Sequence, residues 1–456
     1  MRRRTLLRSL GLAGVTGAAG TASAHPLPTG DGATPATTPT GGEPLGTLDL
    51  AGARELVTSP DGHTAYVATG RGIALVDLVS PSAPRLLAER TELLADSADG
   101  PMQIVQDLAV VEDRLLVAGP AHSAEGASGV VVFDVSDREN PRRTAAVELD
   151  TQIHNCDFDG RYAYVTANGR ETNPLVVVDT DRGEEVGTWS LLDANERWAE
   201  VESALWPLHD VWVQSESAYL AYWDAGTWIV DISDPADISP VSRVRGRDRA
   251  TIAAVDDPWT ERTESPGNDH FVTVDEAAEL LAVGGESWDR DDDGTGGPSG
   301  IELFDISDPT APESLATIDP PPSSDPTPGG VLTTAHNFEL TEGRLYSAWY
   351  NGGVRVHDVR EPTRPREIFR WRDAATTSFW TAQRAAGCFV ASNTTALGGN
   401  DITPSVYTFP DPAVDAATTP PGDGPGGILQ GSGDGFGIAA AVAASGLAAW
   451  RLGRRR

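Results

Sequence analysis

The chain has 456 residues and a formal net charge of −33 at pH 7, and because it contains no lysine all 34 of its basic residues are arginine. So acidic a surface argues against nucleic acid as a partner, since phosphate binding requires clustered cations. Hydrophobic residues make up 39% of the chain and recur in strand-like runs, which excludes an acidic disordered polymer. The composition is typical of a folded protein adapted to high salt, where screening reduces repulsion between surface carboxylates.

The first element in chain order is an export signal, predicted for residues 1–24. Consecutive arginines from Arg2 precede a run of small apolar residues to Ala19, and an Ala-Ser-Ala sequence ending at Ala24 offers a cleavage site. This order resembles a twin-arginine signal, which exports proteins that have already folded. The alternative is an uncleaved N-terminal anchor. Residues 25–43, rich in Gly, Pro and Thr, are predicted to form a flexible linker.

A ten-residue pattern recurs along the chain that follows. It is clearest from Gly226, as Gly-Thr-Trp-Ile-Val-Asp-Ile-Ser-Asp-Pro, and from Gly300. Looser copies begin at Gly72, Gly129 and Gly353. Each copy is a short β-branched run closed by Asp and a polar turn, which predicts a strand followed by a turn. Self-similarity at roughly 45–65 residues predicts a β-propeller or a solenoid.

A second landmark, a strand of the form Ala65-Tyr66-Val67, divides the chain into seven units. Each unit has an apolar strand before this landmark and two strands after it, which makes one four-stranded propeller blade. The seventh unit lacks its fourth strand, and Pro44 to Leu50 has the pattern of one. We therefore predict an all-β fold, a seven-bladed β-propeller over residues 44–410. An N-terminal strand beside Ser405 to Phe409 completes the last blade and leaves no edge exposed.

Three features together resemble the LVIVD-repeat family of β-propellers. They are the Leu-Val-Val-Val-Asp strand from Leu175, the Ala-Tyr-Val strand from Ala163 and the Ser-Asp-Pro turn that ends at Pro309. The resemblance covers roughly the whole repeat region and implies the propeller architecture. The family has no common reaction, so the resemblance implies nothing about chemistry.

Four of the eight histidines occupy one repeat position, the residue that opens the innermost strand of a blade: His154, His209, His270 and His336. The same position holds Gln106 in the second blade, is assigned to Arg54 in the first, and falls on Ser378 or Phe379 in the seventh. Equivalent residues of inner strands form a ring around the channel, and imidazole is a common ligand of zinc and copper. The alternative is a copied structural contact, in which each imidazole bonds a neighbouring backbone carbonyl.

A second repeat position follows the Tyr strand and holds Asn168, Asp224, Glu286 and Asn351. Because neighbouring antiparallel strands run in opposite directions, these residues belong at the same mouth as the histidines. We predict a metal site there, with Asp224 and Glu286 flanking the histidines. The longer connections, 120–128, 168–174, 192–208, 247–269, 286–299 and 319–334, also open on this face. Long loops on a rigid scaffold are where binding residues gather.

One of these connections carries a candidate calcium loop. Asp289, Asp291 and Asp293 alternate and Gly294 follows, as in the first half of an EF-hand loop. No flanking helices are predicted, and Gly300 stands at the twelfth position, where a bidentate Glu belongs. Glu302 or Glu286 would have to replace it. Chance runs of Asp are the alternative in so acidic a chain.

The C-terminal segment is predicted to be a linker over residues 411–435 and a hydrophobic anchor or sorting tail over residues 436–456. Its apolar stretch is short for a bilayer span, but three terminal arginines suit a membrane anchor. Gly-Phe-Gly from Gly435 resembles the archaeal PGF-type sorting tail, although Asp434 stands where that tail has Pro. The resemblance implies cleavage and lipidation. A buried amphipathic helix is the alternative.

Two functions fit these elements. The first is an exported, extracellular scaffold, tethered by its C-terminal tail to a haloarchaeal cell surface, that binds a protein or small ligand on the long-loop face as a monomer. The second is a copper- or zinc-dependent oxidoreductase or hydrolase that uses the His cluster. The chain has no Gly-rich phosphate loop and no Gly-x-Ser-x-Gly or His-Glu-x-x-His sequence, so no catalytic residue is assigned. Cys156 and Cys388 are predicted to be buried and unpaired.

Overall fold

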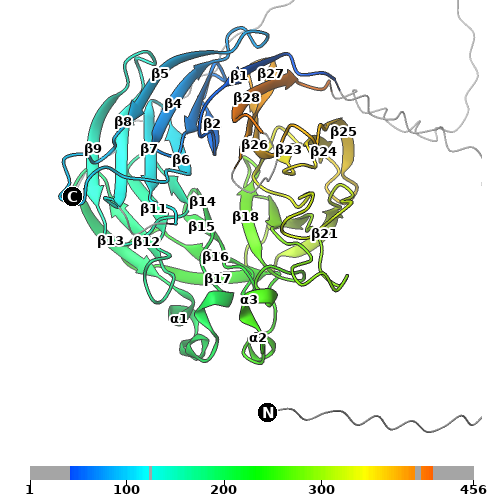
Figure 1. The fold of residues 1–456 in the computed structure, drawn as a ribbon. Coiled ribbons are helices and arrows are strands. Elements are labelled where there is room, and N and C mark those ends of the chain that lie inside the picture. Colours follow the sequence, from blue (N-terminus) through cyan, green and yellow to red (C-terminus); the bar gives the residue numbers. More distant parts are fainter. Residues whose placement is uncertain (1–41, 123–125, 396–401, 414–456) are drawn as a thin grey trace, which may run out of the picture. The chain divides into compact units, whose positions relative to one another are not determined.

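A computed structural model describes residues 42–122, 126–395 and 402–413. This part of the chain is an all-β propeller of seven four-stranded antiparallel sheets around one axis (Figure 1). The first four blades are β2(Leu56–Thr58) β3(Thr64–Ala68) β4(Gly72–Asp77) β5(Arg85–Thr91); β6(Asp107–Val111) β7(Arg114–Gly119) β8(Gly129–Asp134) β9(Arg142–Glu148); β10(Cys156–Phe158) β11(Tyr162–Thr166) β12(Leu175–Asp179) β13(Glu184–Trp189); and β14(Asp210–Gln214) β15(Ser217–Ala221) β16(Thr227–Asp231) β17(Ser239–Val244).

The fifth and sixth blades are β18(Asp269–Val274) β19(Leu280–Gly285) β20(Ile301–Asp305) β21(Glu313–Ile318) and β22(Phe338–Thr341) β23(Arg344–Ala348) β24(Val354–Asp358) β25(Arg366–Trp371). Five short helices lie in two of the connections between blades: α1(Leu191–Ala194), η1(Glu196–Glu200) and η2(Ser203–Leu205) after β13, and α2(Arg249–Ile252) and α3(Pro258–Glu261) after β17. The first strand of each blade faces the axis, so the residues that open these strands lie at the mouth of the central channel.

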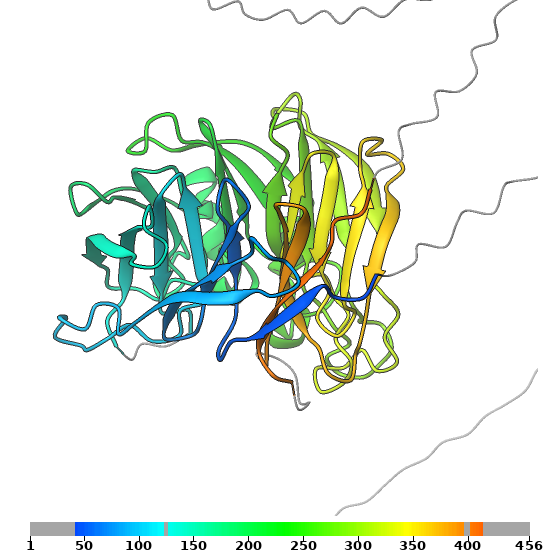
Figure 2. The ribbon, with the colours of Figure 1, turned by 90° about the horizontal axis from the view of Figure 1, so that it is seen from above.

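The seventh blade is closed by the N-terminal strand, which confirms the predicted closure. It contains β26(Phe379–Ala385), β27(Cys388–Asn393), β28(Ser405–Pro410) and β1(Gly46–Asp49), in that order. β1 is antiparallel to β28, with Gly46 opposite Thr408 and Asp49 opposite Ser405. Figure 2 shows the two ends of the propeller side by side as a blue and an orange strand. The ring therefore has no unpaired sheet edge at its seam.

The repeated Asp-Ser-Asp-Pro sequence folds as two successive side-chain-capped turns. In the fifth blade Asp305 ends β20, and its Oδ1 accepts the backbone N–H of Ser307 at 2.9 Å. Asp308 then accepts the N–H of Thr310 at 3.0 Å. The fourth blade repeats both contacts through Asp231 and Asp234. These carboxylates replace backbone partners that a tight turn cannot supply, which explains why the sequence marks each blade so clearly.

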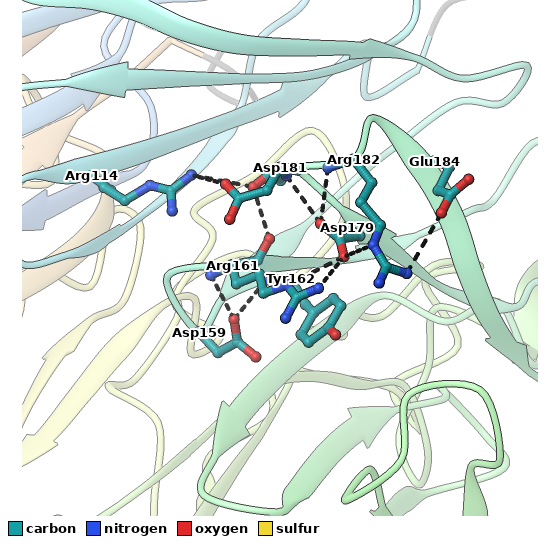
Figure 3. A network of polar contacts seen from close by, with 9 residues as sticks. Arg114, Asp159, Arg161, Tyr162, Asp179, Asp181, Arg182 and Glu184 are labelled. Atoms are coloured by element: carbon teal, nitrogen blue, oxygen red, sulfur yellow. Dashed lines mark hydrogen bonds and ion pairs between the residues drawn. The ribbon is translucent and has the colours of Figure 1, made fainter.

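On the face that carries the short turns, a network of ion pairs and hydrogen bonds lies mostly within the third blade and reaches the second blade through one ion pair (Figure 3). The buried Asp179, at the end of β12, pairs with Arg161 at 2.6 Å and accepts the N–H of Arg182 at 3.0 Å. Arg114 of the second blade reaches Asp181 of the third at 3.1 Å. The opposite face carries the long loops.

Hydrophobic side chains fill the spaces between consecutive blades. One such cluster joins the third and fourth blades through Tyr164, Trp189 and Leu220, all at most 2% exposed. Cys156 and Cys388 lie in separate clusters, buried and unpaired, as predicted. The predicted signal, most of the N-terminal linker and the C-terminal tail lie outside the described residues. Among the residues searched, no helix is long and apolar enough to cross a membrane.

Candidate functional site

Every blade contributes one side chain to a single cavity of about 700 Å³ at the mouth of the channel. In blade order these residues are Arg54, Gln106, His154, His209, His270, His336 and Trp380. The structure thus brings together the four predicted histidines, Gln106 and Arg54. In the seventh blade the position falls on Trp380, so the assignment to Ser378 or Phe379 was wrong.

A β-bulge explains the error in the seventh blade. Phe379 pairs with Asn393 and Thr381 with Ser392, which leaves Trp380 as the extra residue of the bulge. His270 is the extra residue of an equivalent bulge at the start of β18. A bulge re-aims the side chain of the unpaired residue, and here both side chains line the cavity. Alternation along the sequence does not show where such a bulge occurs.

The histidines form a continuous arc along the cavity wall. Ring centroids are 4.2 Å apart between His154 and His209, 3.8 Å between His209 and His270, and 4.8 Å between His270 and His336. A fifth histidine, His122, extends the arc at 4.6 Å from His154. It lies in the predicted long connection 120–128, but no repeat position marks it.

The ring nitrogens of two histidines bond to the next blade. His209 Nδ1 lies 2.8 Å from the carbonyl oxygen of His270, and His336 Nδ1 lies 2.7 Å from that of Trp380. Burial lowers the pKa of His336 to about 3 and holds the pKa values of His154, His209 and His270 well below their ordinary value. The imidazoles are therefore neutral at neutral pH, and a neutral imidazole is the form that binds a metal.

Of the predicted flanking carboxylates, Glu286 lines the cavity and Asp224 does not. Asp224 is fully buried beside the loop that follows β17, where it accepts the N–H of Asn268 at 2.9 Å and lies 3.5 Å from Arg247. The structure thus gives Asp224 a role in holding a loop and does not place it with the histidines. Asn168 lines the cavity, whereas the amide of Asn351 donates to the carbonyl of Thr377.

Glu286 is the centre of a small polar group. Its Oε2 lies 3.3 Å from His270 Nε2, and its Oε1 accepts the hydroxyl proton of Tyr350. Burial raises the pKa of Glu286 to about 7 and raises that of Tyr350 well above its ordinary value. Tyr350 directly precedes the second repeat position, Asn351, and no repeat marks its side chain in the sequence.

Three arginines and four tryptophans complete the cavity wall: Arg54, Arg262, Arg290, Trp223, Trp259, Trp288 and Trp380. The Arg262 guanidinium lies 4.3 Å from the Trp259 ring centroid, and that of Arg290 lies 4.9 Å from the same ring. Among the described residues, none of the three arginines forms an ion pair with a carboxylate. The chain has 67 acidic residues, so these three arginines give the cavity wall a positive charge that is opposite in sign to the net charge of the protein.

The cavity also gathers polar atoms without partners. Of twenty buried side-chain nitrogen and oxygen atoms that lack a hydrogen bond in the described part of the chain, eight belong to cavity residues. These are on Arg54, Gln106, Asn168, Trp223, Arg262, Asn268, His270 and Trp288. Buried polar groups are normally paired, so a concentration of unpaired ones indicates a place for water or a ligand.

The backbone around the cavity is strained as well. Trp223 has φ of 34° and Tyr350 has φ of 47°, a left-handed conformation that large side chains rarely adopt. Ile104, Asn173 and Asn268 share it. The described chain has thirteen non-glycine residues with positive φ, and these five of them line the cavity. Strain of this kind persists at binding and catalytic sites, where it positions side chains.

The candidate calcium loop is only partly assembled. Oxygens of Asp289, Asp291 and Glu264 lie within 4.8 Å of one another. Asp293 is not one of these three groups, and its Oδ1 accepts the N–H and hydroxyl of Thr295 at 2.8 and 2.5 Å. Glu286 belongs to the histidine cavity and does not serve as the twelfth ligand. Two of the three predicted aspartates therefore come together, and calcium binding stays a prediction.

Comparison with known proteins supports the fold and one repeat. Residues 208–245, which span the fourth blade, match the LVIVD repeat family. The chain is a β-propeller with an LVIVD repeat. The Cps50 (Swd1) β-propeller domain of Myceliophteria thermophila is 10% identical with a TM-score of 0.54, over 81% of this chain and 99% of that one. At this identity the likeness shows the fold alone. No curated protein matches the sequence.

Proposed function

We propose that this chain is an exported, surface-tethered propeller that binds a small organic anion with a flat apolar part, acting as a monomer. The observation that carries the proposal is a set of three arginines among four tryptophans in one cavity, and none of the three arginines pairs with a carboxylate in the described part of the chain. Guanidinium groups bind carboxylates in a bidentate manner, and tryptophan rings supply a flat apolar surface. A cavity of about 700 Å³ has the size of known small-molecule sites.

The location of the arginines suits a salt-adapted protein. At about 1 M salt the Debye length is roughly 3 Å, so charges on the open surface attract an anion only at contact. Arg54 and Arg262 are partly buried, and their Nε atoms have no hydrogen-bond acceptor among the described residues. Charges in such positions are screened less, and a bound carboxylate would supply the missing acceptors.

Benzoate and its neutral isostere benzamide provide a matched pair of probes. We expect benzoate to raise the melting temperature and quench tryptophan fluorescence, and benzamide to do neither at the same concentration. Arg262→Met should weaken benzoate binding at least about tenfold, because a charge-assisted hydrogen bond is lost. Arg71→Met, which removes an exposed arginine outside the cavity, is the control. Equal responses to both probes, or equal affinities in both variants, would exclude an anion site here.

Export and tethering rest on the sequence of the two ends. Changing Arg2 and Arg3 to Lys should trap the full-length protein inside the cell, since twin-arginine export requires both arginines. Deleting residues 436–456 should release the folded propeller into the medium. Cell fractionation with an antibody against the propeller measures both outcomes. Surface retention of the truncated chain would show that another contact holds the protein.

A second candidate function is favoured by one observation, the meeting of two imidazoles and a carboxylate in the same wall. A metal-dependent hydrolase would show chelator-sensitive cleavage of a simple ester such as 4-nitrophenyl acetate. Cleavage that survives chelation, or none in the metal-loaded protein, counts against this function.

A further inference from the structure

Two histidines and one glutamate converge from neighbouring blades. His270 lies in the bulge that opens β18, Glu286 directly follows β19, and His336 lies two residues before β22. One ligand atom from each lies within 4.8 Å of the other two. A tetrahedral ion bound at about 2.0–2.1 Å holds neighbouring donor atoms roughly 3.3 Å apart. The 3.3 Å between His270 Nε2 and Glu286 Oε2 already has this value.

The surrounding contacts orient these side chains. The His336 Nδ1–H donates to the carbonyl of Trp380, which leaves Nε2 with its lone pair. Tyr350 donates to one oxygen of Glu286 and leaves the other for His270. His270 Nδ1 has no partner in the described part of the chain, although only 2% of the residue is exposed. His336 and Glu286 therefore have contacts of the kind that fix the tautomer and direction of metal-binding side chains.

A copied structural contact accounts for only part of this arrangement. His209 and His336 each bond the carbonyl of the equivalent residue in the next blade, as a repeated contact between blades would require. His270 makes no such bond and meets Glu286 instead. Glu286 is 9% exposed, and burying its carboxyl beside two imidazoles is costly unless something compensates for it. The repeat does not explain Glu286.

We propose that His270, Glu286 and His336 bind a divalent first-row transition-metal ion, of the zinc or copper class. Three protein ligands that leave positions open toward a cavity are the arrangement of catalytic rather than structural zinc sites. The site is smaller than the predicted four-histidine cluster, because among the described residues no group of three imidazoles meets at one point. His154 and His209 belong to the arc but not to the ligand set. The inference goes beyond anion binding and is tested without an anion.

The full-length protein, freed of metal with a chelator, would be titrated with Co²⁺ and then Zn²⁺. We expect one equivalent of Co²⁺, with visible absorption bands of an N/O-ligated ion that Zn²⁺ displaces. Glu286→Gln and His336→Ala should lose the stoichiometric equivalent, while His63→Ala, an exposed histidine outside the cavity, keeps it. Circular dichroism would verify that each variant is folded, and Glu286→Gln preserves the shape of the side chain if His336→Ala does not fold.

Three results would overturn the proposal: no stoichiometric uptake by the parent, equal uptake by Glu286→Gln and the parent, or loss of the ion in His154→Ala with retention in His336→Ala. Arg262→Met should keep the full equivalent of metal. Failure of the metal site is therefore distinguishable from failure of the anion site.

Discussion

Neighbouring residues of the same inner strand differ in how their polar groups are used. Asp107 accepts the N–H of Cys156 in the next blade at 2.6 Å, while Gln106 beside it lines the cavity with its Oε1 unpaired. Asp210 accepts the N–H of Val272 at 2.9 Å, and His209 beside it belongs to the arc. The comparison separates two kinds of buried polar group: those that join blades are paired, and those at the mouth include many that are not.

Hydrogen bonds of this paired kind recur at most junctions around the ring. In five of the seven junctions between blades, among the described residues, a side-chain oxygen of one inner strand accepts a backbone N–H of the next. The acceptor and donor pairs are Asp107 and Cys156, Asp157 and Val213, Asp210 and Val272, Glu339 and Arg384, and Gln383 and Thr58. These hydrogen bonds hold neighbouring blades together. The polar groups of the cavity are therefore not required for assembly of the ring.

The blade junctions and the cavity at the mouth both require a closed ring. Weakening the closure of the seventh blade is therefore expected to have the largest effect on stability. Leu50, 4% exposed, packs between the first and last blades, whereas Leu45 on the same segment is 40% exposed. Leu50→Ala should lower the free energy of unfolding by about 3 kcal/mol, because it leaves a cavity. Leu45→Ala should change it by less than about 0.5 kcal/mol. Denaturant unfolding at constant salt measures both, and equal effects would mean that the seam contributes no more than the surface does.

Removal of a paired acceptor comes next. Asp210 accepts from the amide of Asn155 at 2.8 Å as well as from Val272. Asp210→Ala should cost about 2 kcal/mol of unfolding free energy, since two buried donors lose their partner. Benzoate affinity should stay within about twofold of the parent, because Asp210 does not line the cavity. A stable variant that no longer binds benzoate would reverse the assignment of the two regions.

A third prediction uses pH. Burial raises the pKa of Glu339 in the folded protein to about 7, from the ordinary value of 4.5. The folded state therefore binds more protons than the unfolded state between these values, and this group lowers stability as pH rises through that window. Glu339→Gln keeps an oxygen for the Arg384 N–H without ionising. The variant should match the parent below pH 4.5 and exceed it by up to about 3 kcal/mol at pH 8, since each pH unit between the two pKa values corresponds to about 1.4 kcal/mol. Thermal unfolding at both pH values measures the difference, and a variant less stable at pH 8 would contradict it.

The sequence contains enough to predict the propeller, its closure and six of the seven residues at the mouth, because each is marked by a repeat. It does not mark the bulge at Trp380, since a bulge depends on how two strands pair. Arg262, Arg290 and Trp259 lie in inserted loops without a repeated pattern, so nothing aligns them with the cavity. Asp224 occupies the same repeat position as Glu286, but the loop around Asn268 closes over it. An equivalent repeat position therefore predicts where a residue lies along its strand, but it does not predict reliably where the side chain points.

The central claim is that polar groups at the mouth serve a ligand while those one residue along hold the ring. Gln106→Met and Asp107→Met test it together, as substitutions of neighbouring residues by the same apolar side chain, by thermal unfolding with and without benzoate. The account predicts that Gln106→Met melts at or above the parent and loses part of its benzoate shift. Asp107→Met should melt several degrees lower and keep the shift. Equal destabilisation of both variants, with the benzoate shift retained in both, would contradict it.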